Sequence, residues 1–178
     1  MDEIIESVLF SEEAIKKRVT ELAEEISRDY PGGDKILIGV LKGSVMFVAD
    51  LMRAFKTDVK MDFMAVSSYG ASSQSSGIVR ILKDLDYDIE NKEIFIIEDI
   101  IDTGNTLKYL YEYLRARNPK LLKIVCLLDK PERRTADIKA DYVGFNIPDA
   151  FVVGYGLDFA ESYRNLPYIG ILKEEVYK

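Results

Sequence analysis

Continuous runs of apolar residues mark the strands that this chain is expected to form. Residues 36–41 and 94–97 are apolar without interruption, and residues 123–129 are nearly so. Such runs are typical of parallel strands that are buried on both faces, because half-exposed strands alternate apolar and polar residues. Residues 59–66 do alternate, which predicts a strand with one apolar face, formed by Val59, Met61, Phe63 and Ala65, and a second face that carries Lys60 and Asp62.

Helical periodicity accompanies these strands. Ser11 can cap a helix that carries Ile15, Val19, Leu22 and Ile26 on one face and ends at residues 31–33. A second helix is expected after residues 42–44, and a third after residues 102–106, where it ends before residues 118–119. The alternation predicts an α/β fold with a mainly parallel twisted sheet flanked by helices. The 178 residues suffice for a single domain, residues 1–178.

Two regions depart from the alternation. Residues 67–77 are rich in serine and glycine and join the segment 59–66 to a strand at 78–82, so they form either a disordered surface loop or a lid over a site. The acidic connector 84–91 suggests no function. Residues 142–149 and 151–158 are short strand-like segments with aromatic residues and glycines, and residues 168–172 are expected to form a closing strand.

Composition restricts the chemistry. The chain contains no histidine, which excludes Ser-His-Asp catalysis and the usual zinc sites. Its one cysteine, Cys126, lies in an apolar strand and is expected to be a buried thiol in a reducing cytoplasm. The net charge of −7 argues against binding to nucleic acid or to an anionic membrane, and no signal-peptide or membrane-spanning pattern occurs.

The richest stretch follows the apolar run 94–97. Glu98 and Asp99 stand near the expected strand end, and residues 102–106 form a turn into a helix, where α/β sheets bind ligands. The helix N-terminus and the hydroxyls of Thr103 and Thr106 can bind a phosphate, while the carboxylates suit ribose hydroxyls or Mg²⁺. An isolated acidic pair would more simply be a surface turn. A second anion site is expected at Lys42 and Gly43.

Residues 94–106 closely resemble the phosphoribosyl-diphosphate (PRPP) motif of the type I phosphoribosyltransferases, and residues 98–104, Glu-Asp-Ile-Ile-Asp-Thr-Gly, resemble its hypoxanthine-guanine branch. The likeness spans residues 36–172. It implies a core of about residues 10–135, a C-terminal hood of about residues 136–178, and a flexible lid hairpin that includes Ser68 and Tyr69. It also implies PRPP and purine-base substrates, a Mg²⁺ cofactor, and a homo-oligomer, either a dimer or a tetramer.

The resemblance also assigns site residues. Asp102 is implied as the catalytic group that handles the purine proton. The PRPP contacts would be Glu98, Asp99, Asp102, Thr103, Gly104, Asn105 and Thr106. Pyrophosphate would be bound by Leu41, Lys42, Gly43 and Arg164, with a cis peptide between Leu41 and Lys42. The purine would be bound by Ile100, Lys130, Phe151, Val152 and Asp158, and the metal by Glu98, Asp99 and Asp158. Asn105 and Ala150 stand where relatives often carry lysine.

Alternatives stay open at this stage. Lys130 lies in the charged run 130–134, which would usually be a solvated turn, and Phe151 would ordinarily be a core residue. The same scaffold serves RNA-binding regulators, although the charge of −7, Asp102 and Lys130 weigh against that reading. A related enzyme could act on xanthine or uracil. A nucleotide-binding kinase or hydrolase is disfavoured, because no Walker A motif occurs.

Overall fold

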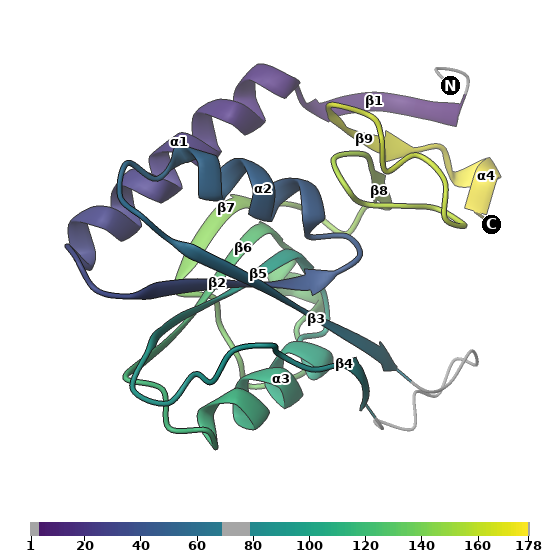
Figure 1. Cartoon of the computed structure of the whole chain (residues 1–178). Helices are drawn as coiled ribbons and strands as arrows, with labels where there is room; N and C mark the ends of the chain where they lie inside the picture. The colour runs from purple at the N-terminus through teal and green to yellow at the C-terminus, as the bar shows by residue number, and fades with distance from the viewer. Residues whose placement is uncertain (1–3, 69–78, 178) are drawn as a thin grey trace.

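The computed structural model describes residues 4–68 and 79–177, and its centre is a six-stranded sheet (Figure 1). The strand order is β4 (Val79–Lys83), β3 (Lys60–Ser68), β2 (Lys35–Leu41), β5 (Glu93–Ile101), β6 (Leu121–Asp129) and β7 (Tyr142–Asn146). Neighbouring strands are parallel except β3 and β4, which are antiparallel. The predicted mainly parallel sheet is confirmed. The strand order changes direction between β2 and β5, which is where α/β sheets bind ligands.

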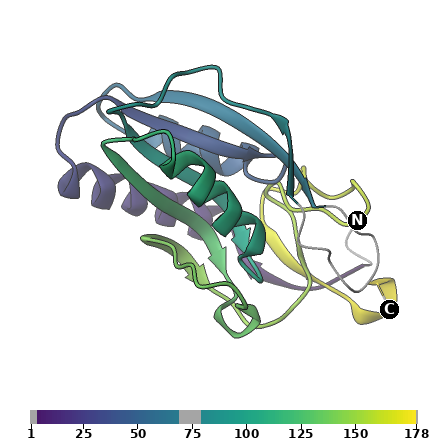
Figure 2. The same cartoon turned by 90° about the horizontal axis from the view of Figure 1, so that it is seen from below.

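Helices cover both faces of the sheet. α1 (Glu12–Asp29) and α2 (Val45–Ala54) pack on one face, and α3 (Asn105–Arg115) packs on the other (Figures 1 and 2). Alternate residues of β5 point to these two layers: Phe95 and Ile97 join the core around α1 and α2, while Ile94 and Ile96 join the core around α3. Burial on both faces therefore explains why this strand is continuously apolar.

Local signals set the ends of the first helix. The side chain of Ser11 accepts a hydrogen bond from the N–H of Ala14 at 3.2 Å, as the sequence predicted for the cap of α1.

Cys126 is buried in β6, and this burial raises the pKa of its thiol. No helix in the described part of the chain is long and apolar enough to cross a membrane.

A second, smaller sheet joins the two ends of the chain. Its order is β1 (Ile5–Phe10), β9 (Ile169–Leu172) and β8 (Val152–Val153), all antiparallel, and α4 (Glu174–Tyr177) follows it (Figure 1). We call this sheet and α4 the hood. The assignment of residues 142–149 to the hood is wrong for β7, which extends the large sheet instead. β1 was not predicted, and its partner β9 lies at the other end of the sequence.

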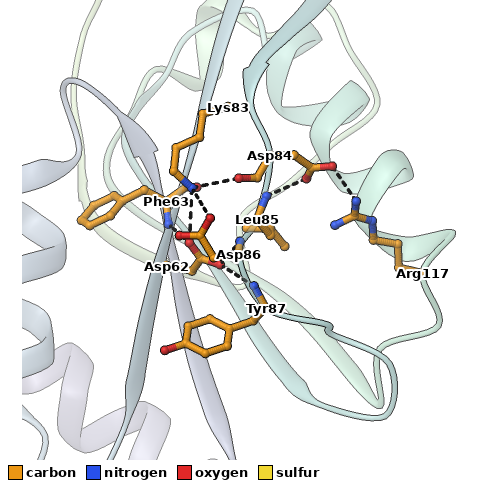
Figure 3. Close-up of polar contacts among 8 residues, drawn as sticks. All are labelled: Asp62, Phe63, Lys83, Asp84, Leu85, Asp86, Tyr87 and Arg117. Carbon is orange, nitrogen blue, oxygen red and sulfur yellow. Dashed lines mark hydrogen bonds and ion pairs between the residues drawn. The ribbon is translucent and has the colours of Figure 1, made fainter.

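The expected faces of β3 also need correction. Met61 is 36% exposed, whereas Asp62 is only 5% exposed. The Asp62 carboxylate accepts hydrogen bonds from the N–H groups of Phe63, Asp86 and Tyr87 at 2.7, 2.8 and 3.1 Å (Figure 3). These bonds satisfy the buried charge, and they fasten the connector between β4 and β5 to the sheet. Part of the acidic connector is therefore a structural anchor.

Candidate active site

The turn after β5 leads directly into α3. Gly104, at the helix N-cap, has a left-handed backbone with φ +84°, which favours glycine, and it makes no side-chain capping bond. The N–H of Asn105 lies 3.5 Å from the Thr103 hydroxyl. Thr106 lies in the first turn of the helix and is partly exposed. Free N–H groups at a helix start, with two hydroxyls beside them, suit a phosphate.

Glu98 and Asp99 lie within β5, because the strand continues to Ile101. Glu98 is buried and Asp99 is partly exposed, and the N–H of Ile100 donates to Asp99 Oδ1 at 2.8 Å. Burial raises the pKa of Asp99 to about 6. Burial, and then the neighbouring Asp99, raise the pKa of Glu98 well above its usual value. Two acids that repel each other in this way are typical of a functional site.

The turn after β2 adjoins this acid pair. The peptide bond between Leu41 and Lys42 is cis, as the resemblance implied. The Ser44 hydroxyl donates to the Val40 carbonyl at 2.7 Å and closes the turn. A Cβ atom on Gly43 would lie 1.7 Å from Asp99 Oδ2, so glycine lets the turn approach this carboxylate closely. The anion site expected at Lys42 and Gly43 therefore adjoins the acid pair of β5.

A cavity of about 700 Å³ opens beside Asp99, within the size range of small-molecule sites. Several predicted site residues line it, namely Asp99, Ile100, Asp102, Lys130, Phe151, Val152 and Asp158. Its other lining residues, to which the sequence suggested no role, are Arg133, Asp149, Leu157, Glu174 and Tyr177. The cavity therefore combines the carboxyl edge of the large sheet with the hood.

Lys130 follows β6 and is only 8% exposed. Its Nζ atom lies 3.6 Å from Asp149 Oδ1. Arg134 is also largely buried, where it forms an ion pair with Asp129 and donates from Nε to the Asp102 carbonyl at 3.1 Å. The solvated-turn interpretation of residues 130–134 is thus wrong for Lys130 and Arg134. A buried ammonium inside a ligand-sized cavity is well placed to donate to a carbonyl oxygen.

Aromatic side chains form one wall of the cavity. The Phe151 ring stacks on Tyr177 with 5.0 Å between the ring centroids, and it meets Phe159 edge-on at 5.6 Å. Val152 is buried in β8. Tyr177 lies in the C-terminal helix α4, and no motif in the sequence pointed to it.

The predicted pyrophosphate residues meet around one carboxylate that the sequence analysis missed. Glu161 Oε2 lies 2.8 Å from Lys42 Nζ, and Glu161 Oε1 lies 3.3 Å from Arg164 Nη2. Arg164 Nη2 also lies 3.0 Å from Asp158 Oδ1. Two cations that are distant in the sequence therefore share one acid, in an arrangement that an anionic ligand could replace.

Asp102 has a partner that the sequence did not suggest, and most of the predicted lid lies outside the described residues. Asp102 Oδ1 accepts a hydrogen bond from Arg133 Nε at 3.0 Å, a contact that the sequence did not suggest. Ser68 ends β3, but Tyr69 and the loop up to residue 78 lie outside the described residues. The lid assigned to Ser68 and Tyr69 therefore stays a prediction.

The acids also fit a divalent cation. Among the described residues, no three His, Cys, Asp or Glu side chains form a preformed metal cluster. Mg²⁺, however, commonly binds through one or two carboxylates and completes its shell with water and substrate phosphates. Glu98, Asp99 and Asp158 offer hard oxygen donors only, and the charge of Asp158 contributes to the raised pKa of Asp99. The donor set therefore suits Mg²⁺ that arrives with a phosphorylated substrate.

Comparison with known proteins agrees with this geometry. Residues 7–160 match the model of the phosphoribosyl transferase domain. The hypoxanthine-guanine phosphoribosyltransferase of Bacillus subtilis is 60% identical over 98% of this chain and 97% of its own length. The Streptococcus pyogenes protein of that name is 52% identical over 99% and 98%. The crystal structure of a hypoxanthine phosphoribosyltransferase from Staphylococcus aureus superimposes with a TM-score of 0.97 at 53% identity, covering 100% of this chain and 97% of that one.

A domain match over most of the chain, full-length relatives and a nearly superimposable structure all agree with the PRPP motif of β5. The chain belongs to the phosphoribosyltransferase family, in the branch of its hypoxanthine-guanine relatives.

Proposed function

We propose that the protein is a purine-salvage enzyme that transfers the 5-phosphoribosyl group of PRPP to N9 of hypoxanthine or guanine, giving IMP or GMP and pyrophosphate. The observation that carries this proposal is the cavity of about 700 Å³ at the carboxyl edge of the sheet. It is lined by a buried cation, Lys130, and by the acids Asp99 and Asp102. The names of the relatives at 60% and 52% identity support the same reaction.

PRPP is expected to lie across the ends of β2 and β5. The turn 102–106 would bind the 5-phosphate through backbone N–H groups and the hydroxyls of Thr103 and Thr106. Glu98 and Asp99 would orient the ribose hydroxyls, and together with Asp158 they would hold Mg²⁺. A bound Mg²⁺ would neutralise charge that develops on the departing pyrophosphate.

The two cations near Glu161 are assigned to the leaving group. Lys42 and Arg164 would bind pyrophosphate oxygens, alongside the backbone of Leu41 and Gly43. Carbon–oxygen cleavage at the anomeric carbon is expected to lead bond formation, which leaves an oxocarbenium-like ribose, as in other glycosyl transfers.

The base would occupy the cavity beneath the hood. Phe151 would stack on the purine, with Ile100 and Val152 beside it, and the Lys130 ammonium would donate to the 6-oxo group. Asp102 would accept the proton that the purine loses, acting at N7. Adenine presents an amino donor at position 6, so the Lys130 ammonium would face a second donor where a 6-oxopurine offers an acceptor.

The test supplies PRPP and Mg²⁺ with each free base in turn, namely hypoxanthine, guanine, xanthine, uracil and adenine, and measures pyrophosphate release. Turnover with hypoxanthine or guanine and rejection of adenine are expected. In Lys130→Met, the ratio of kcat/KM for hypoxanthine to that for adenine should fall about 10–100-fold, as expected for a lost hydrogen bond to a charged group. Release with uracil alone, or with none of the bases, would overturn the proposal.

The setting of the enzyme is part of the proposal. We place it in the cytoplasm, where reducing conditions keep a free thiol such as Cys126 unoxidised. A dimer or tetramer is proposed from the family, and sedimentation analysis tests it. Binding to structured RNA at moderate salt, without pyrophosphate release, would instead favour the RNA-binding regulator.

A further inference from the structure

Two charged side chains in the cavity, Arg133 and Asp149, have no part in the reaction proposed above. Arg133 donates from Nε to Asp102 Oδ1 at 3.0 Å, and its Nη1 lies 3.6 Å from Asp149 Oδ2. The other oxygen of Asp149, Oδ1, lies 3.6 Å from Lys130 Nζ. The four side chains therefore form a chain of alternating charge in the order Asp102, Arg133, Asp149 and Lys130, and its two ends are the groups assigned to the base.

We propose that Arg133 and Asp149 are positioning residues for the base, which set where Asp102 and Lys130 stand before a purine arrives. The inference rests on the proposed function, because it concerns how the same site recognises a 6-oxopurine. N7 and the 6-oxo group lie on the same edge of that base. The carboxylate and the ammonium that contact them must therefore converge without pairing directly with each other.

The local structure supports separate roles for the two adjacent arginines. Arg134 fixes the backbone of this segment, because it donates to the carbonyls of Asp102 and Ile138 at 3.1 and 2.8 Å and pairs with Asp129. Arg133 has no such backbone contact in the described part of the chain, and its side chain is 48% exposed. Arg133 can therefore change partners while Arg134 holds the turn in place.

Asp149 also lines the cavity, between Arg133 and Lys130 in the chain of ion pairs. It lies in the segment between β7 and β8, so its carboxylate connects the end of the large sheet to the start of the hood. Lys130 has a flexible stem and gains a fixed direction from this contact. When a purine binds to Asp102, Arg133 keeps Asp149 as its partner. Asp149 then pairs with both Arg133 and Lys130, so neither cation is left without an acid.

The exposure of the pairs allows this exchange. Partly exposed ion pairs contribute little net stability, so the bond between Arg133 and Asp102 can yield to a base that offers Asp102 a proton. The bond between Arg133 and Asp102 contributes by orienting the Asp102 carboxylate, because a catalytic group displaced by about 1 Å loses much of its effect.

The experiment measures kcat and KM for hypoxanthine and for PRPP in Arg133→Met, Arg133→Lys and Asp149→Asn, with thermal unfolding as a check on folding. Arg133→Met should lower kcat/KM for hypoxanthine about 5–20-fold, the range for a weakened charge-assisted bond that is partly exposed. KM for PRPP should stay within about twofold, as expected for a site the change does not touch. Arg133→Lys should recover part of the loss, which a purely structural role would not predict.

The matched control is Arg115→Met, which removes the same charge at the exposed last turn of α3. Combining Arg133→Met with Asp149→Asn should cost less than the sum of the two single changes, because both interrupt one chain. If Arg133→Met behaves like Arg115→Met, or if KM for PRPP rises as much as KM for hypoxanthine, the inference is wrong. A parent protein that releases no pyrophosphate with any purine would instead refute the proposed function.

Discussion

The two ends of β5 each bury a glutamate, and their surroundings are opposite. Glu93, at the amino end, is 8% exposed, and its carboxylate lies 3.7 Å from Lys35 Nζ and 2.9 Å from Lys120 Nζ. Glu98, in the carboxyl half of the strand, is 9% exposed, and its neighbour is another acid, Asp99. One strand therefore carries a glutamate paired with two lysines near one end and two adjacent acids near the other.

The difference separates scaffold from site. A buried acid between two lysines leaves little net charge for a ligand to use, so the amino end of the strand serves stability. Two adjacent acids destabilise the free protein, and such an arrangement persists where a ligand offsets it. The carboxyl end is also the edge where parallel sheets bind ligands. Changes at the two ends should therefore affect different properties, catalysis at one and folding at the other.

The largest effect is expected just beyond the carboxyl end. Asp102→Asn should lower kcat about 10²–10⁴-fold, the usual loss when a general acid–base group is removed. PRPP affinity and the unfolding temperature should remain near those of the parent, because the Asp102 side chain is 45% exposed and an amide keeps its shape. Steady-state kinetics with a PRPP titration provide the measurement. An unchanged kcat would remove Asp102 from the mechanism.

At the amino end, Glu93→Gln should lower the free energy of unfolding by about 2–4 kcal/mol, since it leaves Lys35 as an uncompensated buried charge. The activity of the molecules that remain folded should be unchanged. Denaturant unfolding and the specific activity of the folded fraction measure the two properties.

Glu98→Gln is the matched variant at the other end of the strand. It removes one acid of a repelling pair, so it should leave stability equal or higher while weakening PRPP binding. Loss of stability in both variants would show that the two ends do not differ in the way proposed.

These contrasts also show what the sequence could predict. The runs 36–41 and 94–97 indicated buried parallel strands, because burial on both faces leaves a local record in the residue pattern. The turn 102–106 was equally visible, since its glycine and hydroxyls are adjacent in the chain. In contrast, β1 was missed because it pairs with β9 at the other end of the chain, and β7 was assigned to the hood because its short, aromatic-rich segment does not record that it pairs with β6.

Side-chain partners were harder still. Lys130 lies in a charged run that would usually be solvated, and Asp62 lies on the polar face of the alternating strand 59–66, yet both are buried next to partners from other segments. Nothing in the local sequence connects Glu161 with Lys42, or Arg133 with Asp102. Ion pairs of this kind depend on tertiary packing, which residue patterns within one segment do not record.

A smaller effect should appear as a pH dependence of stability. The pKa of Asp99 is raised from an ordinary 3.8 to about 6 in the folded protein, so the folded state binds a proton more tightly than the unfolded state. The stability linked to this group is fully present below about pH 4 and is lost as the pH rises through about 6.

Comparison of the parent with Asp99→Asn, without Mg²⁺, measures this contribution. The unfolding free energy of the parent should fall by about 1–2 kcal/mol relative to the variant between pH 4 and pH 7, less than a full two-unit shift implies because Asp99 is partly exposed. Parallel pH profiles in the two proteins would contradict the assignment.

The smallest effect is expected where a site acid is exposed. Glu161 pairs with Lys42 and Arg164 as Glu93 pairs with two lysines, but its side chain is 66% exposed. Exposed pairs contribute about 0.2–1 kcal/mol, so Glu161→Gln, which removes a carboxylate that competes with the ligand for the two cations, should tighten pyrophosphate binding by only about 2–5-fold. Because salt screens such pairs, the gain should shrink at high ionic strength.

Glu132→Gln, which removes an exposed acid that forms no ion pair within the described residues, provides the control for net charge. Calorimetric titration with pyrophosphate at two salt concentrations separates the cases. An equal gain in both variants would mean that overall charge, and not the shared carboxylate, limits binding at this end of the site.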